Sequence, residues 1–304
     1  MKILKKIALA FLAFLILGSL GGYLYFDQKF TPEENYLSVE NESGPVRFTW
    51  LGREKNVLLL PIHFSSDTAT YYLQFDTGSP CTVFYSRSIK MIRGITIDKD
   101  RASASFYIGK TKITSDKFKI FHYGDDNDKT DSPRIIGTIG ADILESRKTI
   151  INFRKDHIVF NTTKTFGQFQ AKMADFKFKK RKIIFRGILK GKEENFLFDS
   201  GTSAYELLTN KEVWQNLKTP DSKISIEKSN SWENMLTTYT ANCNQKIQFG
   251  NQEIPLRNVT YVEGFSKTQY ALMKFSGMTG MLGNKIFLNN CLYIDCIQNK
   301  MLIE

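Results

Sequence analysis

Two short stretches decide the fold of this chain: LQFDTGS at residues 73–79 and FLFDSGT at residues 196–202. Each places an apolar run, typical of a buried β-strand, directly before an Asp, a Thr or Ser, and a Gly. A single Asp-Thr-Gly or Asp-Ser-Gly is most often a surface turn. Two copies in one chain of 304 residues suggest instead that the chain contains an internal repeat.

Two further pairs of stretches repeat in the same order. FYIGK at residues 106–110 matches IQFGN at residues 247–251. Downstream, IGTIGAD at residues 136–142 matches MTGMLGN at residues 278–284. Repeated blocks in a fixed order are the mark of two copies of one structural unit.

The repeat also defines the domain organisation. Each half closes with two short apolar runs, at residues 150–153, 158–160, 292–295 and 301–303. Short runs of this kind predict a mostly β protein; apolar spacing typical of a helix is scarce after residue 46, and residues 205–217 are its best case. We therefore predict one lobe at residues 46–165, a connector at 166–175 and a second lobe at 176–304.

The duplicated motif resembles the active-site motifs of the pepsin-like and retropepsin-like aspartic proteases. FDTGS at residues 75–79 and FDSGTS at 198–203 are similar to the motif of each lobe in that family. IGTIG at 136–140 and GMLG at 280–283 resemble the element that passes beneath each Asp loop. The resemblance implies an all-β, two-lobe acid-protease fold with a pseudo-twofold repeat. Because both motifs lie in one chain, a monomer is sufficient to form the site.

The resemblance implies that Asp76 and Asp199 are the catalytic pair of an aspartic endopeptidase. Two close carboxylates that share one proton can activate a water molecule and polarise a peptide carbonyl, and they then exchange roles. Two like charges at short distance do not both ionise easily, so the pair titrates as a unit. Gly78 and Gly201 allow tight turns in which backbone N–H groups approach the carboxylates.

Four hydroxyl residues accompany the two aspartates. We expect Ser79 and Thr202 to donate hydrogen bonds to the outer carboxylate oxygens, which would favour the charged form. Thr77 and Ser200 resemble the clasp of the family, in which each hydroxyl bonds the backbone of the other lobe. The predicted supporting residues are thus Thr77, Gly78, Ser79, Ser200, Gly201 and Thr202.

One departure from the family keeps a second hypothesis open. The flap signature Tyr-Gly-Thr-Gly of pepsin-like enzymes is missing between residues 76 and 135. By position alone, the flap candidates are residues 88–105 in the first half and 224–242 in the second. A non-catalytic, membrane-tethered module that binds peptides or proteins on the same fold is therefore the alternative, because fold does not fix function.

Other hydrolase chemistries fit the sequence poorly. A haloacid-dehalogenase phosphatase needs a second Asp two residues after its nucleophile, and Gly78 and Gly201 stand at those positions. Cys81 and Ser203 have no assigned His partner and do not lie in a Gly-x-Ser-x-Gly elbow. The predicted reaction is therefore hydrolysis by water between carboxylates, with a peptide or protein as substrate.

Composition argues against metal, cofactor and nucleic-acid chemistry. The chain has 3 His and 4 Cys, with no HExxH and no CxxC, so we expect no metal and no cofactor. A net charge of +11 accompanies no long basic run, which disfavours nucleic-acid binding. If the protein is exported to an oxidising compartment, a disulfide from Cys243 to Cys291 or Cys296 is compatible with the sequence.

The N-terminus predicts a membrane anchor. Residues 7–26 form an uncharged stretch of 20 residues, which as a helix spans about 30 Å, and Lys2, Lys5 and Lys6 precede it. The lysines place the N-terminus in the cytoplasm and the remainder outside it. We therefore predict a transmembrane segment at residues 1–26 and a tether at 27–45; a cleaved signal peptide, which would give a secreted protein, is the alternative.

Overall fold

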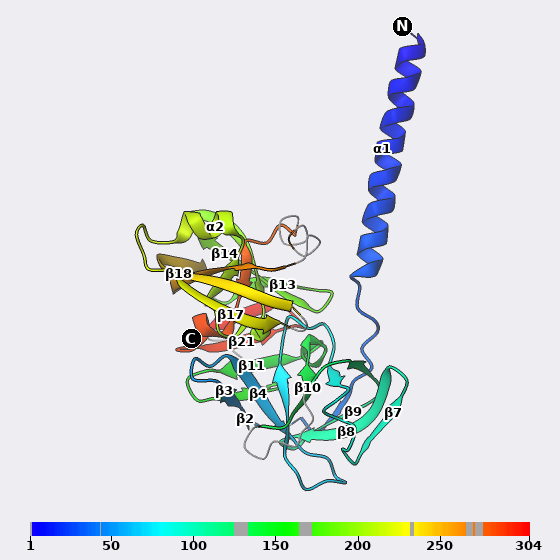
Figure 1. Ribbon diagram of the computed structural model, residues 1–304, viewed down its shortest axis with the longest axis vertical. Helices are drawn as coiled ribbons and strands as arrows, with labels where there is room; N and C mark the ends of the chain where they lie inside the picture. Colours follow the sequence, from blue (N-terminus) through cyan, green and yellow to red (C-terminus); the bar gives the residue numbers. More distant parts are fainter. Residues whose placement is uncertain are drawn as a thin grey trace. The chain divides into compact units, whose positions relative to one another are not determined.

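The structure is a computed structural model that describes residues 2–42, 44–124, 133–163, 172–231, 234–265, 270 and 276–304 (Figure 1). Two units divide the chain, at Met1–Glu34 and Asn35–Glu304. The first unit contains one helix, α1 (Lys2–Lys29), and its segment Lys5–Lys29 is long and apolar enough to cross a membrane. The large apolar side chains between Ile7 and Phe26 are all exposed, and Phe14, for example, is 72% exposed. The helix ends three residues beyond the predicted boundary at residue 26.

The second unit is built mainly of β-strands, as the sequence predicts. The strands of the first half are β1 (Ser38–Glu40), β2 (Val46–Arg47), β3 (Thr49–Leu51), β4 (Val57–Ile62), β5 (Tyr71–Phe75), β6 (Val83–Tyr85), β7 (Ile95–Asp98), β8 (Arg101–Ile108), β9 (Thr111–Phe121), β10 (Ile135–Ile139), β11 (Lys148–Asn152) and β12 (His157–Val159). Those of the second half are β13 (Ala174–Lys179), β14 (Lys182–Leu189), β15 (Lys192–Phe198), β16 (Leu207–Thr209), β17 (Ser225–Ser231), β18 (Asn234–Phe249), β19 (Gln252–Glu263), β20 (Gly280–Leu282), β21 (Cys291–Asp295) and β22 (Lys300–Ile303).

The two halves have the same strand order, which gives the fold its pseudo-twofold repeat. The first sheet runs β3-β4-β5-β10-β6-β9-β8-β7, and the second contains β13-β14-β15-β20-β16-β19-β18-β17. Strand directions agree as well: β5 is parallel to β10 as β15 is to β20, and β10 is antiparallel to β6 as β20 is to β16. The predicted two-lobe, all-β architecture with a pseudo-twofold repeat is therefore confirmed.

A shared sheet joins the lobes. β11 of the first lobe pairs antiparallel with β21 of the second, with Ile150 opposite Tyr293. β12 and β22 flank this pair on either side, so that each lobe contributes equivalent strands. Short 3-10 helices, at Ala141–Leu144 and Asn284–Phe287, precede β11 and β21. Backbone hydrogen bonds between the lobes thus fix their relative position.

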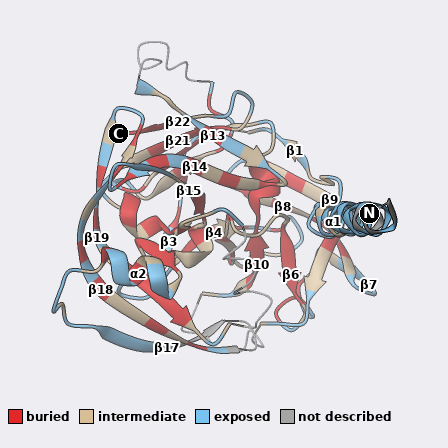
Figure 2. Ribbon diagram, turned by 90° about the horizontal axis from the view of Figure 1, so that it is seen from above, coloured by how far each residue is buried: buried red, intermediate tan, exposed pale blue. Residues whose placement is uncertain are grey.

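Buried residues, many of them aromatic, form the core of the folded unit. In Figure 2, β6 and β10 are among the strands coloured as buried. Phe75 and Phe198, the last residues of β5 and β15, are fully buried. The ring of Phe198 stacks on that of Phe185, with centroids 5.6 Å apart, and meets the ring of Phe287 edge-on. Burial of a side chain of this size stabilises the fold by roughly 1.5–3 kcal/mol. The residue that follows each of these anchored strands is one of the two aspartates.

The folded unit begins earlier than the sequence analysis expected. The predicted tether at residues 27–45 contains β1, which pairs with β9 and places Ser38 opposite Thr114. Asn35 Nδ2 also donates to the main-chain oxygen of Asp142, at 2.9 Å. Strand pairing recruits this polar segment because β9 otherwise has an unpaired edge there. Residues 166–171 of the predicted connector lie outside the described part of the chain.

The structure contains neither of the disulfides that the sequence left open. Cys243 lies on β18, is buried and has a free thiol. Burial raises the pKa of this thiol to about 11, which keeps it protonated and unreactive at neutral pH.

Candidate active site

Asp76 and Asp199 occupy equivalent positions at the ends of strands β5 and β15. The N–H of Asp76 donates to the carbonyl of Ile139 at 3.0 Å, and that of Asp199 donates to the carbonyl of Leu282 at 2.9 Å. Ile139 and Leu282 end β10 and β20, the strands that run parallel to β5 and β15. Each aspartate is therefore fixed by the Gly-containing strand beside it.

Backbone N–H groups bind each carboxylate within its own loop. Gly78 N donates to Asp76 Oδ1 at 2.9 Å, and Gly201 N donates to Asp199 Oδ1 at 2.9 Å. Ser79 N adds a longer contact to Asp76 Oδ1, at 3.3 Å. The predicted approach of N–H groups to the carboxylates is therefore present in both loops.

The two carboxyl groups face each other across the lobe interface, each beside the glycine of the other loop. A Cβ atom on Gly78 would lie 2.6 Å from Asp199 Oδ1, and one on Gly201 would lie 2.5 Å from Asp76 Oδ1. Neither glycine has a positive φ angle, so the need for glycine here is one of space. Each loop thus leaves room only for the carboxylate of the other lobe.

Thr77 and Ser200 form a reciprocal clasp beneath the aspartates. Thr77 Oγ1 donates to the carbonyl of Phe198 at 2.8 Å and accepts from Ser200 N at 3.0 Å. Ser200 Oγ donates to the carbonyl of Phe75 at 2.8 Å and accepts from Thr77 N at 2.9 Å. Both side chains are fully buried, and none of these four polar groups is left without a partner.

The hydroxyls of Ser79 and Thr202 do not reach the carboxylates, and this expectation was wrong. Ser79 Oγ donates to the carbonyl of Cys81 at 2.8 Å, and Thr202 Oγ1 donates to the main-chain oxygen of Asp199 at 2.9 Å. The tight loops bring backbone carbonyls within reach of both hydroxyls. These side chains stabilise the shape of the loops, while backbone N–H groups hold the carboxylates.

The environment raises the pKa of both aspartates. For Asp76 the cause is burial, which the N–H group of Gly78 partly offsets. For Asp199 burial and the negative charge of Asp76 act together, and its pKa lies well above the usual value. The pair therefore holds one proton at pH values where an exposed Asp is ionised. Tyr85 also has an electrostatic contact to Asp76, and burial raises its pKa to about 12.

Asp142 and Asn284, the last residues of the matching stretches 136–142 and 278–284, contact the aspartate loops, and the sequence analysis did not identify them as site residues. The carboxylate of Asp142 accepts from Thr82 N at 2.6 Å and Thr82 Oγ1 at 2.8 Å. Asn284 Nδ2 donates to the carbonyl of Ser200 at 3.2 Å and to Ser203 Oγ at 3.0 Å. Both side chains therefore stabilise an aspartate loop from behind. Their shared position after the Gly of each repeat was the available signal.

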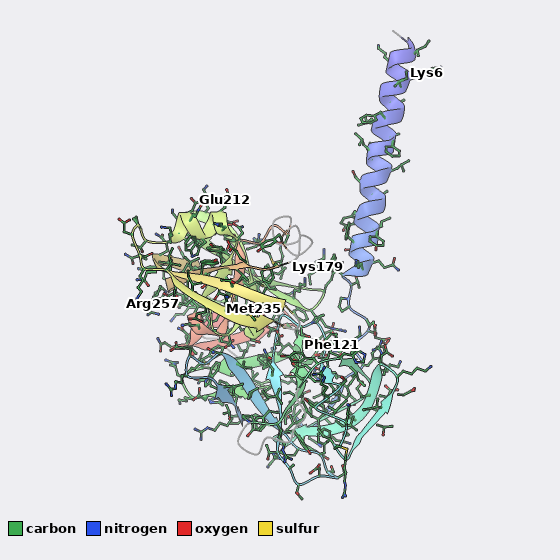
Figure 3. All side chains as sticks on the ribbon, in the orientation of Figure 1. Lys6, Phe121, Lys179, Glu212, Met235 and Arg257 are labelled. Atoms are coloured by element: carbon green, nitrogen blue, oxygen red, sulfur yellow. The ribbon has the colours of Figure 1, made fainter. Side chains whose placement is uncertain are left out.

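Both flap candidates contain β-hairpins, and the second is the longer one. In the first lobe β7 pairs with β8 over four positions, from Ile95 to Asp98. In the second lobe β17 pairs with β18 over seven, from Ser225 to Ser231. Met235, near the end of this hairpin, is 60% exposed and is labelled in Figure 3. Residues 232–233 of the candidate lie outside the described part of the chain.

A metal-binding cluster is not found among the described residues: no three His, Cys, Asp or Glu side chains converge there. The candidate site consists of two carboxyl groups, the backbone donors around them and the clasp that joins their loops. This arrangement can hold one proton between two acids, and it can both accept a proton and donate one.

Comparison with known proteins finds a similar solved structure but no similar sequence. No protein-family model matches the chain, and no curated protein matches it. Among solved structures, it is similar to an aspartic proteinase from Irpex lacteus, with a TM-score of 0.53 and 9% identity. The match covers 88% of this chain and 97% of that proteinase. At this identity the likeness concerns architecture, and the chain has the fold of an aspartic proteinase.

Proposed function

We propose that the chain is an aspartic endopeptidase that hydrolyses peptide bonds with water activated between Asp76 and Asp199. One observation carries this proposal: two carboxyl groups from equivalent loops lie so close across the lobe interface that the charge of Asp76 raises the pKa of Asp199. A surface-turn Asp has no reason to be held in this way. The close packing at Gly78 and Gly201 is further support, because a side chain at either glycine would collide with the carboxyl group of the opposite aspartate.

The reaction needs only the two acids and water. The ionised aspartate takes a proton from water, and the water oxygen bonds to the peptide carbonyl carbon. At the same time the protonated aspartate donates its proton to the carbonyl oxygen. This step gives a neutral tetrahedral diol and reverses the protonation of the pair. The newly protonated aspartate then donates to the amide nitrogen, the C–N bond breaks, and a hydroxyl proton returns to the other aspartate.

The direct test uses the full-length protein in detergent with a mixed peptide library. We expect endoproteolytic cleavage at acidic pH that a transition-state analogue with a tetrahedral hydroxyl, such as a statine peptide, inhibits. Binding of the analogue without any cleavage would favour the alternative, a membrane-tethered peptide-binding module. Absence of both would contradict a functional aspartate pair.

The pH dependence of the rate provides a second test. The active pair needs one shared proton, so the rate should peak on the acidic side of neutral and fall as pH rises through the raised pKa of the pair. Because the Ser79 hydroxyl donates to the carbonyl of Cys81, Ser79→Ala should leave this alkaline limb in place. A rate that climbs steadily from about pH 5 to about pH 9 contradicts the shared proton.

We further propose that α1 anchors the protein in a membrane, with the N-terminus cytoplasmic and the lobes outside. The length and apolar surface of Lys5–Lys29 support this, as do the lysines that precede the apolar stretch. The full-length protein should therefore stay with membranes during alkaline carbonate extraction. If the mature protein instead begins between residues 17 and 25 of this sequence, the segment is a cleaved signal peptide.

A further inference from the structure

Each lobe extends one hairpin turn to the aspartate loop of the other lobe. The turn between β13 and β14, at residues 180–181, reaches the loop that follows Asp76. The turn between β3 and β4, at residues 52–56, reaches the loop that follows Asp199. These strands are equivalent in the two lobes, so the contacts form a reciprocal pair.

Arg181 makes the first of these contacts with a buried side chain. Its Nε donates to Glu145 Oε2 at 3.1 Å, and its Nη1 donates to the carbonyl of Pro80 at 3.4 Å. Arg181 is only 6% exposed, and Glu145 caps the short helix behind the Asp76 loop. A buried guanidinium without hydrogen-bond partners strongly destabilises a fold. Movement of the Asp76 loop away from the second lobe would separate Arg181 from Glu145 and Pro80, so these contacts oppose that movement.

Ser203 makes the second contact. Its Oγ donates to the carbonyl of Lys55 at 2.9 Å, and it also accepts from Asn284 Nδ2 at 3.0 Å. Beside it, Lys285 Nζ lies 3.6 Å from Glu54 Oε2. Pro80 and Ser203 are both the fourth residue after their aspartate. The two hairpin turns therefore contact the same point of the two loops.

The backbone at Arg181 indicates that its side chain is needed there. Lys180 and Arg181 have φ angles of +54° and +56°. Two-residue turns of this kind favour Asn and Gly, because most other side chains are strained in the left-handed region. Strain that persists at a buried, hydrogen-bonded residue points to a role for that residue.

We propose that these two turns are reciprocal braces, and that Arg181 and Ser203 are positioning residues that set the distance between the Asp76 and Asp199 carboxyl groups. The inference deepens the proposed function, because it concerns the aspartates that we propose as catalytic. Arg181 lies behind the loop and acts through Pro80, so it does not touch substrate. The ion pair of Arg181 with Glu145 is more deeply buried than the Lys285–Glu54 pair beside Ser203, so we expect Arg181 to be the stronger brace.

Arg181→Asn removes the contacts of the guanidinium group while keeping a residue that suits the turn. Asn suits the left-handed backbone, so the turn itself should form at least as well as in the wild type. Glu145 keeps a partner in this variant, because Asn35 Nδ2 donates to it at 2.9 Å. Lys190→Asn is the matched control: Lys190 has a φ of +52° in the turn between β14 and β15, and its Nζ contacts only its own lobe, at the carbonyl of Asn216.

The first readout is the titration of the aspartate pair, which needs no substrate. For each background we compare the melting temperature with and without Asp199→Asn across the acidic to neutral range. Repulsion within the pair makes Asp199→Asn increasingly stabilising as pH rises. The gain in melting temperature therefore grows with pH and reaches a plateau above the raised pKa of the pair. An added separation of about 1 Å at an effective dielectric constant of about 20 lowers that pKa by about one pH unit.

We therefore expect the plateau to begin about one pH unit lower in the Arg181→Asn background. With Lys190→Asn it should begin at the same pH as in the wild-type background. Asp142, whose pKa is about 6 and which has an electrostatic contact to Arg181, is present on both sides of each comparison, so its effect cancels. Tyr85 stays neutral throughout this range. Ser203→Ala should give a smaller shift in the same direction.

The second readout is kinetic. A misplacement of about 1 Å can lower the rate by about 100-fold, so Arg181→Asn should reduce kcat by roughly 10- to 100-fold with little change in KM. An unchanged plateau in Arg181→Asn overturns the brace even if the wild type is an active protease. If wild-type protein cleaves nothing but the plateau still moves, the brace holds and the proposed function fails. If wild type shows no plateau, the carboxyl groups do not interact and both fail.

Discussion

Replacing either Asp76 or Asp199 with asparagine should lower kcat for peptide cleavage by about 1,000-fold or more. Asparagine has the same shape and can hydrogen bond, but it can neither take a proton from water nor return one to the leaving amine. Peptidase assays on Asp76→Asn, Asp199→Asn and wild-type protein measure this loss. Substantial cleavage by either variant would assign the reaction to other groups.

The same variants should be as stable as the wild type or more stable at neutral pH. The native pair binds a proton that the unfolded chain has already released, so the pair destabilises the fold as pH rises from the ordinary Asp pKa through the raised one. Either substitution removes this repulsion, and the double variant should gain less than the sum of the two. Melting curves at about pH 4 and about pH 8 test it, and additive effects independent of pH would show that the carboxyl groups do not interact.

Gly201→Ala should have the second largest effect, because the added carbon falls on the opposite aspartate. Its Cβ would lie 2.5, 2.6 and 2.7 Å from the Oδ1, Cγ and Oδ2 atoms of Asp76, so the carboxyl group must shift by several tenths of an ångström. We expect a loss of roughly 100-fold in kcat and of about 1–3 kcal/mol in the free energy of unfolding. Kinetics and chemical denaturation measure the two quantities.

Gly191→Ala is the control for this experiment. Gly191 has a φ of +76° and no atom within 4 Å of an added Cβ, so it tests backbone strain without a steric clash. It should lower the free energy of unfolding by about 1 kcal/mol and leave kcat unchanged. Wild-type kcat in Gly201→Ala would mean that the loop can move away from Asp76, and that the spacing of the pair is not critical.

The helical pattern at residues 205–217 shows where sequence reasoning was incomplete. Only Lys211–Leu217 forms the helix α2, which begins after Asn210, whose side chain accepts from Val213 N at 2.9 Å. Residues Leu207–Thr209 form β16 instead, between β19 and β20. Local spacing is compatible with either structure, and pairing with strands distant in the sequence decides between them.

The order of the repeats, the strand-forming runs and the identity of the two aspartates were all readable from the sequence. These features are local: alternating apolar residues specify strands, and turn residues such as Gly78 and Gly201 lie within a few positions of the aspartates. The pseudo-twofold arrangement of the fold followed from them, because two copies of one pattern adopt the same strand order.

Only the tertiary structure decided how the site is held together. The clasp joins Thr77 and Ser200, which are 123 residues apart, and the brace joins Arg181 to a loop 101 residues away. The partners of the Ser79 and Thr202 hydroxyls, and the raised pKa values of the pair, likewise depend on burial and on which carbonyl lies nearest. Contacts and desolvation of this kind arise only when distant segments pack, so no local pattern in the sequence specifies them.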